Sequence, residues 1–225
     1  MSIGSTLPLR ASRRATSYLG AGAILDRDGT LIDFHRDEEL GAVVSAFHPD
    51  QIRILPGVIE GLRLLAEAGY LLAIATNQPG AAKGQSSWAA IERTNEALIA
   101  ELARHGISIA AVAVCGHHPE GGPGGEARLI RACDCRKPAP GLLLELCRDL
   151  HLDPGASIMI GDTEADLEAA RRAGMRAGIL RDTARCELCP GRARLLRPLD
   201  PAPGPTFPPP IVAPRLDALA RFLLT

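Results

Sequence analysis

The sequence feature that most constrains the fold is a short apolar run that ends in two carboxylates. Residues 21–25 are apolar or small, and Asp26-Arg-Asp-Gly-Thr30 follows them directly. An apolar run of this length, closed by a turn residue, is typical of a buried strand in a parallel sheet. Asp26 and Asp28 would then lie at the carboxyl end of the strand, where open α/β sheets bind ligands. Because such close carboxylates repel each other, this motif alone indicates either a compensating Mg²⁺ ion or a solvated Asp-rich turn.

Apolar runs alternate with helical spacings along most of the chain. Helices are expected over 56–69, 87–105, 140–150, 165–173 and 216–224. Strands are expected over 21–26, 71–75, 107–114, 157–161, 177–180 and 211–212, with weak strand character at 42–44 and 52–55. This alternation predicts an α/β fold with a doubly wound, Rossmann-like parallel sheet and helices on both faces.

The length and composition predict one soluble globular domain. The chain has 225 residues, of which 46% are hydrophobic and only 3% aromatic, so the core must be built from Leu, Ile, Val and Ala. We expect residues 1–20 to be an N-terminal lead-in and residues 21–225 to form the single domain. A Pro-rich, irregular excursion is expected over residues 183–210.

Charge and hydropathy exclude several classes of partner. The net charge of −1 gives no indication of a nucleic-acid partner or an anionic membrane surface. No run approaches the ~18 apolar residues of a membrane helix, and the first 20 residues lack the apolar segment of a secretory signal. We therefore expect a cytoplasmic protein, monomeric and acting on a small molecule. In that compartment its six cysteines are metal ligands or free thiols rather than disulfides.

Polar side chains follow two further strands of the expected sheet. Thr76, Asn77 and Gln78 end the second strand, and a hydroxyl and backbone N–H groups there can hold phosphate oxygens. Asp162 and Asp166 follow a later strand, where the competing interpretation is capping of the next helix. Lys137 precedes Pro138 at the start of another helix, and a single lysine there is usually a solvated charge.

A glycine-rich loop at 115–137 carries a second set of ligand-forming side chains. Cys115, His117, Cys133 and Cys135 would form a plausible Cys₃His zinc site. His118 is a competing ligand that spacing alone does not exclude, and unrelated loop thiols are the other interpretation. Four protein ligands leave no open position, so a structural zinc is favoured over a catalytic one. The remaining Cys186-Glu-Leu-Cys189 motif has no second pair of ligands nearby that could complete a metal site, which favours unpaired surface thiols.

The combination of motifs is more informative than its parts. Asp-x-Asp, Thr, Lys and Gly-Asp-x-x-x-Asp occur in this order at successive strand ends, over roughly residues 21–182. This arrangement resembles the haloacid dehalogenase superfamily of phosphotransferases.

The resemblance implies a role for each of these groups. Asp26 would be the nucleophile that forms an aspartyl-phosphate. Asp28 would protonate the leaving alkoxide and later deprotonate the attacking water. Mg²⁺ would be held by the Asp26 side chain, the Asp28 backbone carbonyl and Asp162. Thr76 and Lys137 would stabilise charge on the transferring oxygens.

The zinc loop sharpens the resemblance. Together with Asp26-Arg-Asp-Gly-Thr and Thr76-Asn-Gln, the Cys-x-His-His-Pro and Cys-Asp-Cys-Arg-Lys-Pro segments resemble the heptose 1,7-bisphosphate phosphatase family. That family removes the 7-phosphate of D-glycero-D-manno-heptose 1,7-bisphosphate and supplies a precursor of the activated heptose of lipopolysaccharide. The resemblance implies that Asn77, Gln78, Arg136 and Lys83 contact the substrate.

Three alternatives remain at this level. Histidinol-phosphate phosphatase shares the core motifs, but its zinc loop is shorter, whereas fourteen residues separate His118 from Cys133 here. A catalytically silent, zinc-stabilised binding protein is disfavoured because every catalytic position holds a competent residue. A zinc-ribbon nucleic-acid module is disfavoured by the net charge and by the lack of interleaved aromatic and basic residues.

Overall fold

A six-stranded parallel sheet runs through the part of the chain that the computed structural model describes, namely residues 20–37, 41–182 and 207–225. The strand order is β5-β4-β1-β6-β7-β8, so that β1 lies inside the sheet between β4 and β6. The strands are β1 (Gly22–Leu25), β4 (Leu71–Asn77), β5 (Ala111–Cys115), β6 (Ile158–Gly161), β7 (Arg176–Leu180) and β8 (Ile211–Ala213). The chain winds outward from β1 to β5 and then returns to β6 on the other side, which makes β1 and β6 the switch point where such sheets bind ligands.

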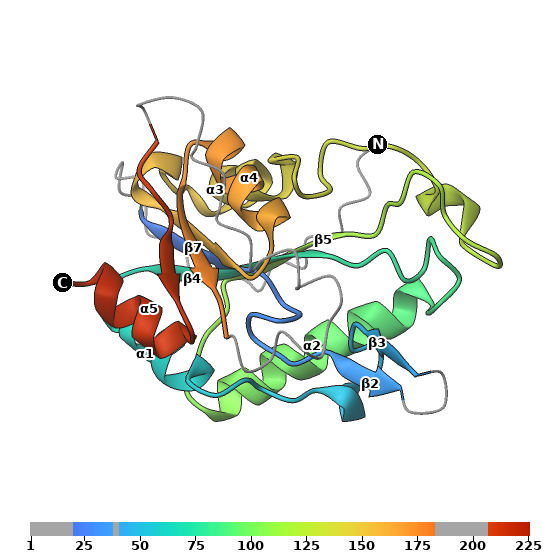
Figure 1. Ribbon diagram of the computed structural model, residues 1–225, viewed down its shortest axis with the longest axis horizontal. Helices are drawn as coiled ribbons and strands as arrows, with labels where there is room; N and C mark the ends of the chain where they lie inside the picture. Colours follow the sequence, from blue (N-terminus) through green and yellow to red (C-terminus); the bar gives the residue numbers. More distant parts are fainter. Residues whose placement is uncertain (1–19, 38–40, 183–206) are drawn as a thin grey trace.

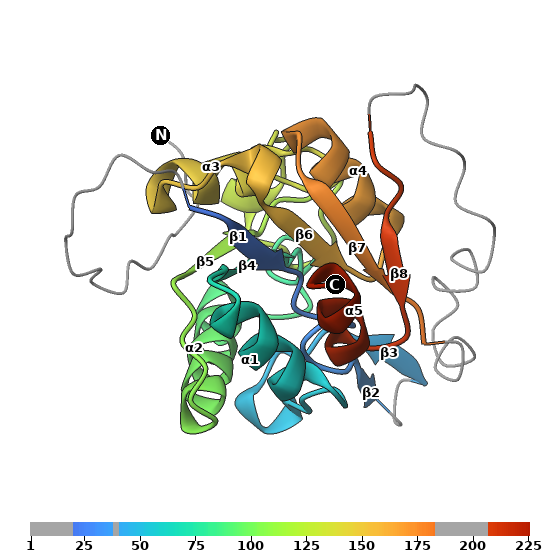
Figure 2. The ribbon, with the colours of Figure 1, turned by 90° about the vertical axis from the view of Figure 1, so that its left-hand side faces the viewer.

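Helices cover both faces of this sheet. On one face lie α1 (Val58–Glu67), α2 (Trp88–Arg104) and α5 (Leu216–Leu223), and on the other lie α3 (Gly141–Leu150) and α4 (Glu164–Ala173) (Figures 1 and 2). A separate antiparallel pair, β2 (His35–Asp37) and β3 (Ala42–Val44), lies beyond the end of β1. Three short 3₁₀ helices span Pro49–Gln51, Ala127–Leu129 and Pro154–Ala156.

Local sequence explains where the helices begin and end. The side chain of Ser87 accepts a hydrogen bond from the Ala90 backbone N–H at 3.2 Å and so caps the start of α2. Thr163 and Asp166 form a reciprocal capping box at the start of α4. Gly174, with a φ of 73°, ends α4 in the left-handed conformation that suits glycine.

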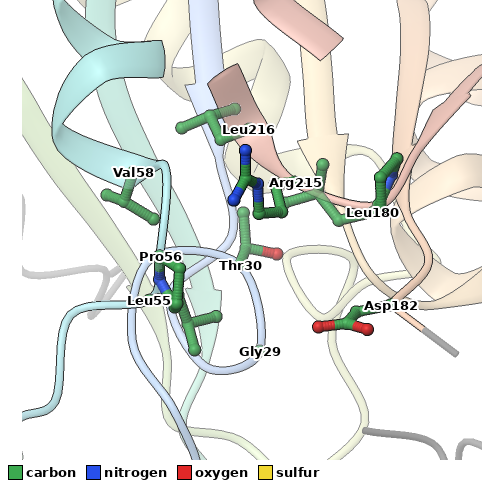
Figure 3. A pocket seen from close by; sticks show the side chains of 10 residues that line it. Gly29, Thr30, Leu55, Pro56, Val58, Leu180, Asp182, Arg215 and Leu216 are labelled. Carbon is green, nitrogen blue, oxygen red and sulfur yellow. The ribbon is translucent and has the colours of Figure 1, made fainter. Parts of the chain in front are cut away.

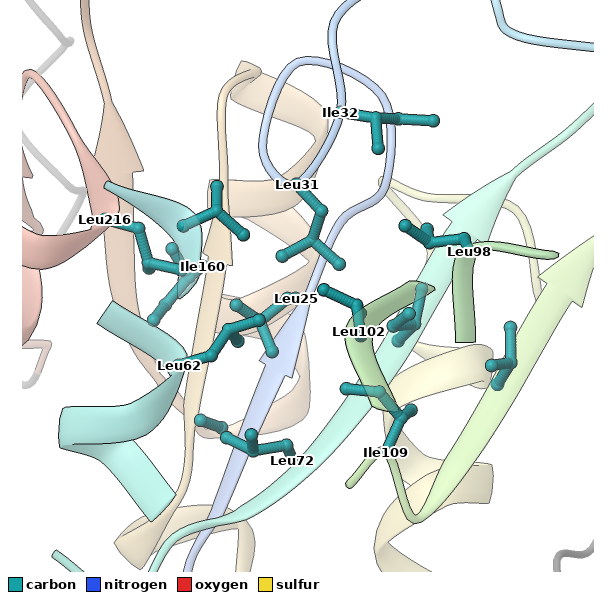
Figure 4. Packing of buried hydrophobic residues seen from close by; sticks show 14 of the residues in the cluster. Leu25, Leu31, Ile32, Leu62, Leu72, Leu98, Leu102, Ile109, Ile160 and Leu216 are labelled. Atoms are coloured by element: carbon teal, nitrogen blue, oxygen red, sulfur yellow. The ribbon is translucent and has the colours of Figure 1, made fainter. Parts of the chain in front are cut away.

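Two apolar layers, one on each face of the sheet, form the core. The larger joins the strands to α1, α2 and α5, with Leu25 and Ile160 facing Leu62 and Leu216 (Figure 4). The smaller layer joins the strands to α3 and α4. No aromatic side chain is among the buried hydrophobic residues of the described ranges, which confirms the expectation of an aliphatic core.

The structure confirms the predicted doubly wound sheet and corrects some of its boundaries. Residues 107–110 were expected to extend the third strand, but β5 begins at Ala111, which is the first residue paired with β4. Ile107 and Ile109 are nevertheless buried, and this apolar packing explains the misleading pattern. The expected weak strand at 52–55 contributes only an isolated bridge between Ile54 and Ile32. Strand β2 was not predicted, because three polar residues give no apolar alternation.

Several expectations fall on residues that the structure does not describe. The lead-in 1–20 and the excursion 183–210 lie almost wholly outside the described residues, as do Cys186 and Cys189. The predicted domain boundaries therefore stay predictions. None of the helices in the described ranges has both the length and the apolar character that a bilayer-spanning segment needs.

Candidate active site

The turn after β1 presents the two aspartates at the carboxyl edge of the sheet. The Asp26 backbone N–H donates to the Ile160 carbonyl at 2.9 Å, which extends the pairing of β1 with β6 by one residue. The chain then folds back tightly, since the N–H groups of Leu31 and Ile32 both donate to the Arg27 carbonyl. Gly29 has a φ of 84°, a conformation that a side chain would strain, so the glycine makes this turn possible.

Lys137 joins two carboxylates that come from different elements. Its Nζ donates to Asp26 Oδ1 at 2.7 Å, to Asp166 Oδ1 at 2.6 Å and to the Ala75 carbonyl at 2.8 Å. The lysine is 4% exposed, so this ammonium is held away from water with all three of its N–H donors used. The interpretation of Lys137 as a solvated charge is therefore wrong.

The charge balance around Asp26 is negative. Burial raises the pKa of Asp26 to about 7, Lys137 acts against that rise, and Asp166 and Asp162 add to it. Burial alone would lower the pKa of Lys137, but Asp166 and Asp26 outweigh burial and raise it. The lysine is therefore a fixed cation, and one positive charge faces three carboxylates.

This surplus of carboxylate is suited to a divalent cation. Oxygens of Asp26, Asp162 and Asp166 lie within 4.8 Å of one another. Hard cations such as Mg²⁺ prefer carboxylate oxygens, and an ion here would offset the charge that raises the pKa of Asp26. Both oxygens of Asp166 already accept hydrogen bonds, one from Lys137 and one from Thr163, so Asp26 and Asp162 are better placed to coordinate the ion.

The Asp28 carboxylate lies in a different environment from that of Asp26. It is 6% exposed and accepts hydrogen bonds from the Arg27 guanidinium, the Ala46 backbone N–H and the Gln78 side chain. The two aspartates of the motif are thus divided: Asp26 pairs with Lys137, and Asp28 pairs with Arg27.

Thr76, Asn77 and Gln78 continue from β4 into the same edge. Gln78 Nε2 donates to Asp28 Oδ2 at 2.6 Å and to Thr76 Oγ1 at 2.9 Å. The Asn77 side chain donates to the Lys137 carbonyl at 3.0 Å and accepts from the Lys137 N–H at 3.1 Å. In this structure the side chains of Asn77 and Gln78 therefore position Lys137 and Asp28.

The glycine-rich loop brings its four expected ligands together. The Sγ atoms of Cys115, Cys133 and Cys135 lie 3.2–3.6 Å apart, and His117 Nδ1 is 3.2 Å from Cys135 Sγ. A zinc ion with ligand bonds of about 2.3 Å has ligand atoms roughly 3.8 Å apart, so these atoms would need to separate by only a few tenths of an ångström. His118, the competing ligand, instead accepts a hydrogen bond from the Gly121 N–H at 3.1 Å.

The protonation states of this cluster fit a metal site. Burial and the charge of Arg131 lower the pKa of His117, which favours the neutral imidazole that a metal requires. Burial raises the pKa of Cys133, and a hydrogen bond with Cys115 raises that of Cys135. Without a metal these thiols would stay protonated, so a metal ion would bind by displacing their protons.

Two of the expected substrate contacts form a basic cluster. Burial lowers the pKa of His118, and the nearby charges of Lys83 and Arg136 lower it further. Both cations are half-buried, and Arg136 Nη1 donates to the His117 carbonyl at 3.4 Å. Arg136 directly precedes Lys137 in the sequence.

A hollow of about 250 Å³ adjoins Gly29 and Thr30, in the turn after Asp28 (Figure 3). Gly29 and Thr30 contribute to it, together with the ends of β7 and β8 and the start of α5. Its one arginine, Arg215, is paired with Asp217 at 3.0 Å. Lys137 and its partners Asp26 and Asp166 do not line this hollow. The candidate catalytic groups therefore lie outside it, in the acidic cluster around Lys137.

Two residues of the site were not identified from the sequence, and the sequence left open whether a third, Asp166, belongs to the site or caps a helix. Asp166 does both, because one oxygen caps α4 and the other holds Lys137. Its place in the Gly-Asp-x-x-x-Asp motif was the available signal. Arg27 and Asn95 are joined by a hydrogen bond of 2.7 Å across 68 residues, and no local pattern predicts such a contact.

Comparison with known proteins agrees with this geometry. Residues 134–185 match the family model described as HAD-hydrolase-like. The chain is 36% identical over 162 residues to D-glycero-beta-D-manno-heptose-1,7-bisphosphate 7-phosphatase of Pasteurella multocida, covering 72% of this chain and 81% of that protein. The corresponding enzyme of Escherichia coli K12 is 35% identical over 157 residues, which cover 69% of this chain and 76% of the enzyme.

Solved structures give the same result. The D,D-heptose 1,7-bisphosphate phosphatase from B. bronchiseptica, crystallised with magnesium and phosphate, aligns with a TM-score of 0.68 and 27% identity. That alignment covers 91% of this chain and 98% of the other. A HAD-like phosphatase from Mesorhizobium loti aligns with a TM-score of 0.63 and 28% identity, over 76% of this chain and 77% of the other.

Proposed function

This chain belongs to the haloacid dehalogenase-like hydrolases and, within them, to the D-glycero-D-manno-heptose 1,7-bisphosphate 7-phosphatase family, and from that premise we propose its reaction. It hydrolyses the 7-phosphate of D-glycero-D-manno-heptose 1,7-bisphosphate in the cytoplasm, for synthesis of activated heptose. The observation that carries the proposal is the 2.7 Å contact between Lys137 Nζ and Asp26 at the switch point of the sheet. This contact holds the Lys137 ammonium beside the carboxylate nucleophile, where negative charge develops on the oxygens of the transferring phosphoryl group.

In the first step an Asp26 oxygen attacks phosphorus. A P–O bond to Asp26 forms, the P–O bond to the sugar breaks, and the sugar oxygen leaves with a proton from Asp28. Lys137 and the Thr76 hydroxyl stabilise charge on the phosphoryl oxygens. Lys137 also fixes the orientation of Asp26, because its own position is set by Asp166 and the Ala75 carbonyl.

In the second step water attacks the phosphorus of the aspartyl-phosphate. The P–O bond to Asp26 breaks, the Asp26 carboxylate is restored, and Asp28 takes the proton from the water. Inorganic phosphate is released, and it carries the oxygen of the attacking water. Asp28 thus returns to the protonated form that the next substrate needs.

Two metal ions complete the proposal. Asp26, Asp162 and the Asp28 backbone carbonyl would hold Mg²⁺, which supplies positive charge that lets an anionic nucleophile approach an anionic phosphate. Cys115, His117, Cys133 and Cys135 would hold a structural Zn²⁺, whose role is to order residues 115–137. The proposed working form is a monomer.

The distal phosphate of the substrate requires a cation away from Asp26. Arg136 and Lys83 provide it beside His118, and the fork of Arg136 suits two phosphate oxygens. Asn77 and Gln78 support recognition indirectly, since their side chains hold Lys137 and Asp28 in place.

Steady-state kinetics on a set of phosphate esters test the proposal. The set comprises the heptose 1,7-bisphosphate, a hexose bisphosphate, a sugar monophosphate and histidinol phosphate, each assayed with Mg²⁺. We expect the highest kcat/KM for the heptose bisphosphate, release of the 7-phosphate alone by ³¹P NMR, and loss of turnover on chelation that Mg²⁺ restores. A higher kcat/KM for histidinol phosphate would contradict the proposed substrate, and no turnover of any ester would contradict the proposed reaction.

A further inference from the structure

Arg27 separates the two aspartates of the motif and is buried completely. Its relative exposure is 0%, and it is among the largest fully buried side chains of the described ranges. A guanidinium is almost never buried in this way unless every donor finds a partner. The partners of Arg27 therefore indicate what the protein gains from burying it.

The guanidinium of Arg27 holds Asp28 by two donors. Its Nε donates to Asp28 Oδ2 at 3.0 Å, and its Nη2 donates to Asp28 Oδ1 at 3.2 Å. Two parallel N–H···O bonds from a planar fork fix both the position and the rotation of a carboxylate. Both oxygens of Asp28 therefore accept a hydrogen bond from Arg27.

Other elements fix Arg27 in turn. Nη1 donates to Asn95 Oδ1 on α2 at 2.7 Å, and Nη2 also donates to the Ala46 carbonyl at 2.9 Å. Asn95 is 5% exposed, so this bond is shielded from water. The guanidinium is therefore held from one side by α2 and from another by the segment after β3.

Asp28 completes the network. Its Oδ1 accepts the Ala46 N–H at 3.2 Å, and its Oδ2 accepts Gln78 Nε2 at 2.6 Å. Each oxygen thus has two donors, one from Arg27 and one from another residue. Four donors from three different parts of the chain leave the carboxyl group little freedom to rotate.

We propose that Arg27 is a positioning residue that holds the Asp28 carboxyl group in the orientation it needs as the base of the second chemical step. Asn95 supports this role indirectly, because its side chain accepts a hydrogen bond from Arg27 and so holds the guanidinium in place. This inference rests on the proposed function. In that step the water oxygen bonds to phosphorus, the bond from phosphorus to Asp26 breaks with its electrons returning to the carboxylate, and the water proton goes to Asp28.

An aryl phosphate separates this role from a general structural one. p-Nitrophenolate is a stable anion that leaves without a proton, so the first step with p-nitrophenyl phosphate does not need Asp28 as an acid. The second step still needs Asp28 as a base. Stopped-flow release of p-nitrophenolate therefore reports the first step as a burst and the second step as the slower rate that follows.

The test compares the parent protein with Arg27→Gln in the presence of Mg²⁺. We expect a burst of about one p-nitrophenolate per site at a rate within roughly fivefold of the parent, and a following rate reduced at least about tenfold. The phosphorylated enzyme should accumulate and be visible by mass spectrometry after acid quench. Arg63→Gln, on the exposed side of α1, is the matched control and should leave both rates unchanged.

The other outcomes overturn the inference. Equal slowing of both phases would mean that Arg27 serves only the fold, and two unchanged phases would mean that Asp28 needs no such support. If Arg27→Gln fails to fold, Asn95→Ala decides by the same measurement, with the same pattern at smaller amplitude expected. A parent that turns over no phosphate ester contradicts the proposed function itself. An active parent whose variants change both phases equally, or neither, contradicts only this inference.

Discussion

Lys137 is the single residue on which the geometry of the site depends most strongly. Its ammonium meets Asp26 and Asp166, which lie 111 and 29 residues away along the chain. Its backbone is held by Asn77 through two further hydrogen bonds. A buried cation with this many partners is costly to disturb, because removing it would leave two carboxylates close together without compensation.

Replacing the proposed nucleophile tests the mechanism at this scale. Asp26→Asn should lower kcat at least about 1,000-fold, because a neutral amide does not attack phosphorus. The circular dichroism spectrum and the melting temperature should show a folded protein, since the amide oxygen can still accept from Lys137. Turnover within tenfold of the parent would contradict the assignment of Asp26.

Arg136 allows a test of substrate recognition. Arg136→Ala should raise KM for the heptose bisphosphate at least about tenfold, because the distal phosphate loses a charged partner. KM and kcat for a sugar monophosphate should change little, which makes the monophosphate the internal control. Equal losses on both substrates would mean that Arg136 supports Lys137 rather than binding the distal phosphate.

At the scale of elements, the proposed zinc ion would help to order the loop after β5. Cys115 ends β5, whereas Cys133 and Cys135 follow a stretch with many glycines. Cys133→Ser should reduce the zinc content from about one per chain and increase hydrogen exchange over residues 115–137.

A cysteine outside the cluster provides the control for this experiment. Cys147→Ala, on α3, removes a buried thiol that has no part in the ligand set and should leave the zinc content unchanged. A parent protein purified without chelators and free of zinc would contradict the proposed metal site.

Helix α4 carries an ion-pair network whose stabilising effect depends on pH. A hydrogen bond from Arg171 lowers the pKa of Glu168 to about 2, with a further contribution from Arg172. Because the folded-state pKa is lowered from 4.5, the stabilisation is fully present above pH 4.5 and is lost as pH falls through about 2.

Glu168→Gln measures this contribution. The three side chains are about a third or more exposed, so the free energy of unfolding at neutral pH should fall by less than about 1 kcal/mol. The difference between parent and variant should shrink as the pH is lowered below 4.5. Urea unfolding at a series of pH values gives the difference, and a difference that grows toward acid would contradict the network.

At the scale of the whole molecule, the last described segment completes the layer that α1 begins. β8 pairs with β7 in parallel, and α5 packs against α1 on the same face of the sheet (Figure 2). The approach of the two helices is close at Gly61, where a Cβ would lie 2.7 Å from the Leu216 carbonyl carbon and 2.8 Å from the Asp217 nitrogen. Because these are backbone atoms, no side-chain rotation can relieve the contact.

Gly61→Ala should therefore push α5 away from α1. We expect the free energy of unfolding to fall by about 1–3 kcal/mol, as for other overpacked contacts, with kcat close to that of the parent. Gly155→Ala is the control, because a Cβ there meets only Asp153 Oδ1 at an ordinary 3.5 Å. Equal stability of Gly61→Ala and the parent would contradict the close packing of these helices.

Local sequence alone is enough to predict the alternation of strands and helices, the aliphatic core and the residues that cluster at strand ends. These follow from local periodicity and from the rule that parallel strands end at one edge, which brought Asp26, Thr76 and Asp162 together in advance. The charge pairs, by contrast, form only in the folded chain: Lys137 pairs with Asp26 and Asp166, and Arg27 pairs with Asp28.

The physical reason is that burial and partner choice are properties of the folded chain. A lysine or arginine in sequence has no preferred partner, and it acquires one only when packing removes water and brings particular carboxylates within reach. Asp166 illustrates the difference, since its capping of α4 is a local feature that the sequence carries. Its hold on Lys137 requires the fold to bring together two residues that are 29 positions apart in the sequence.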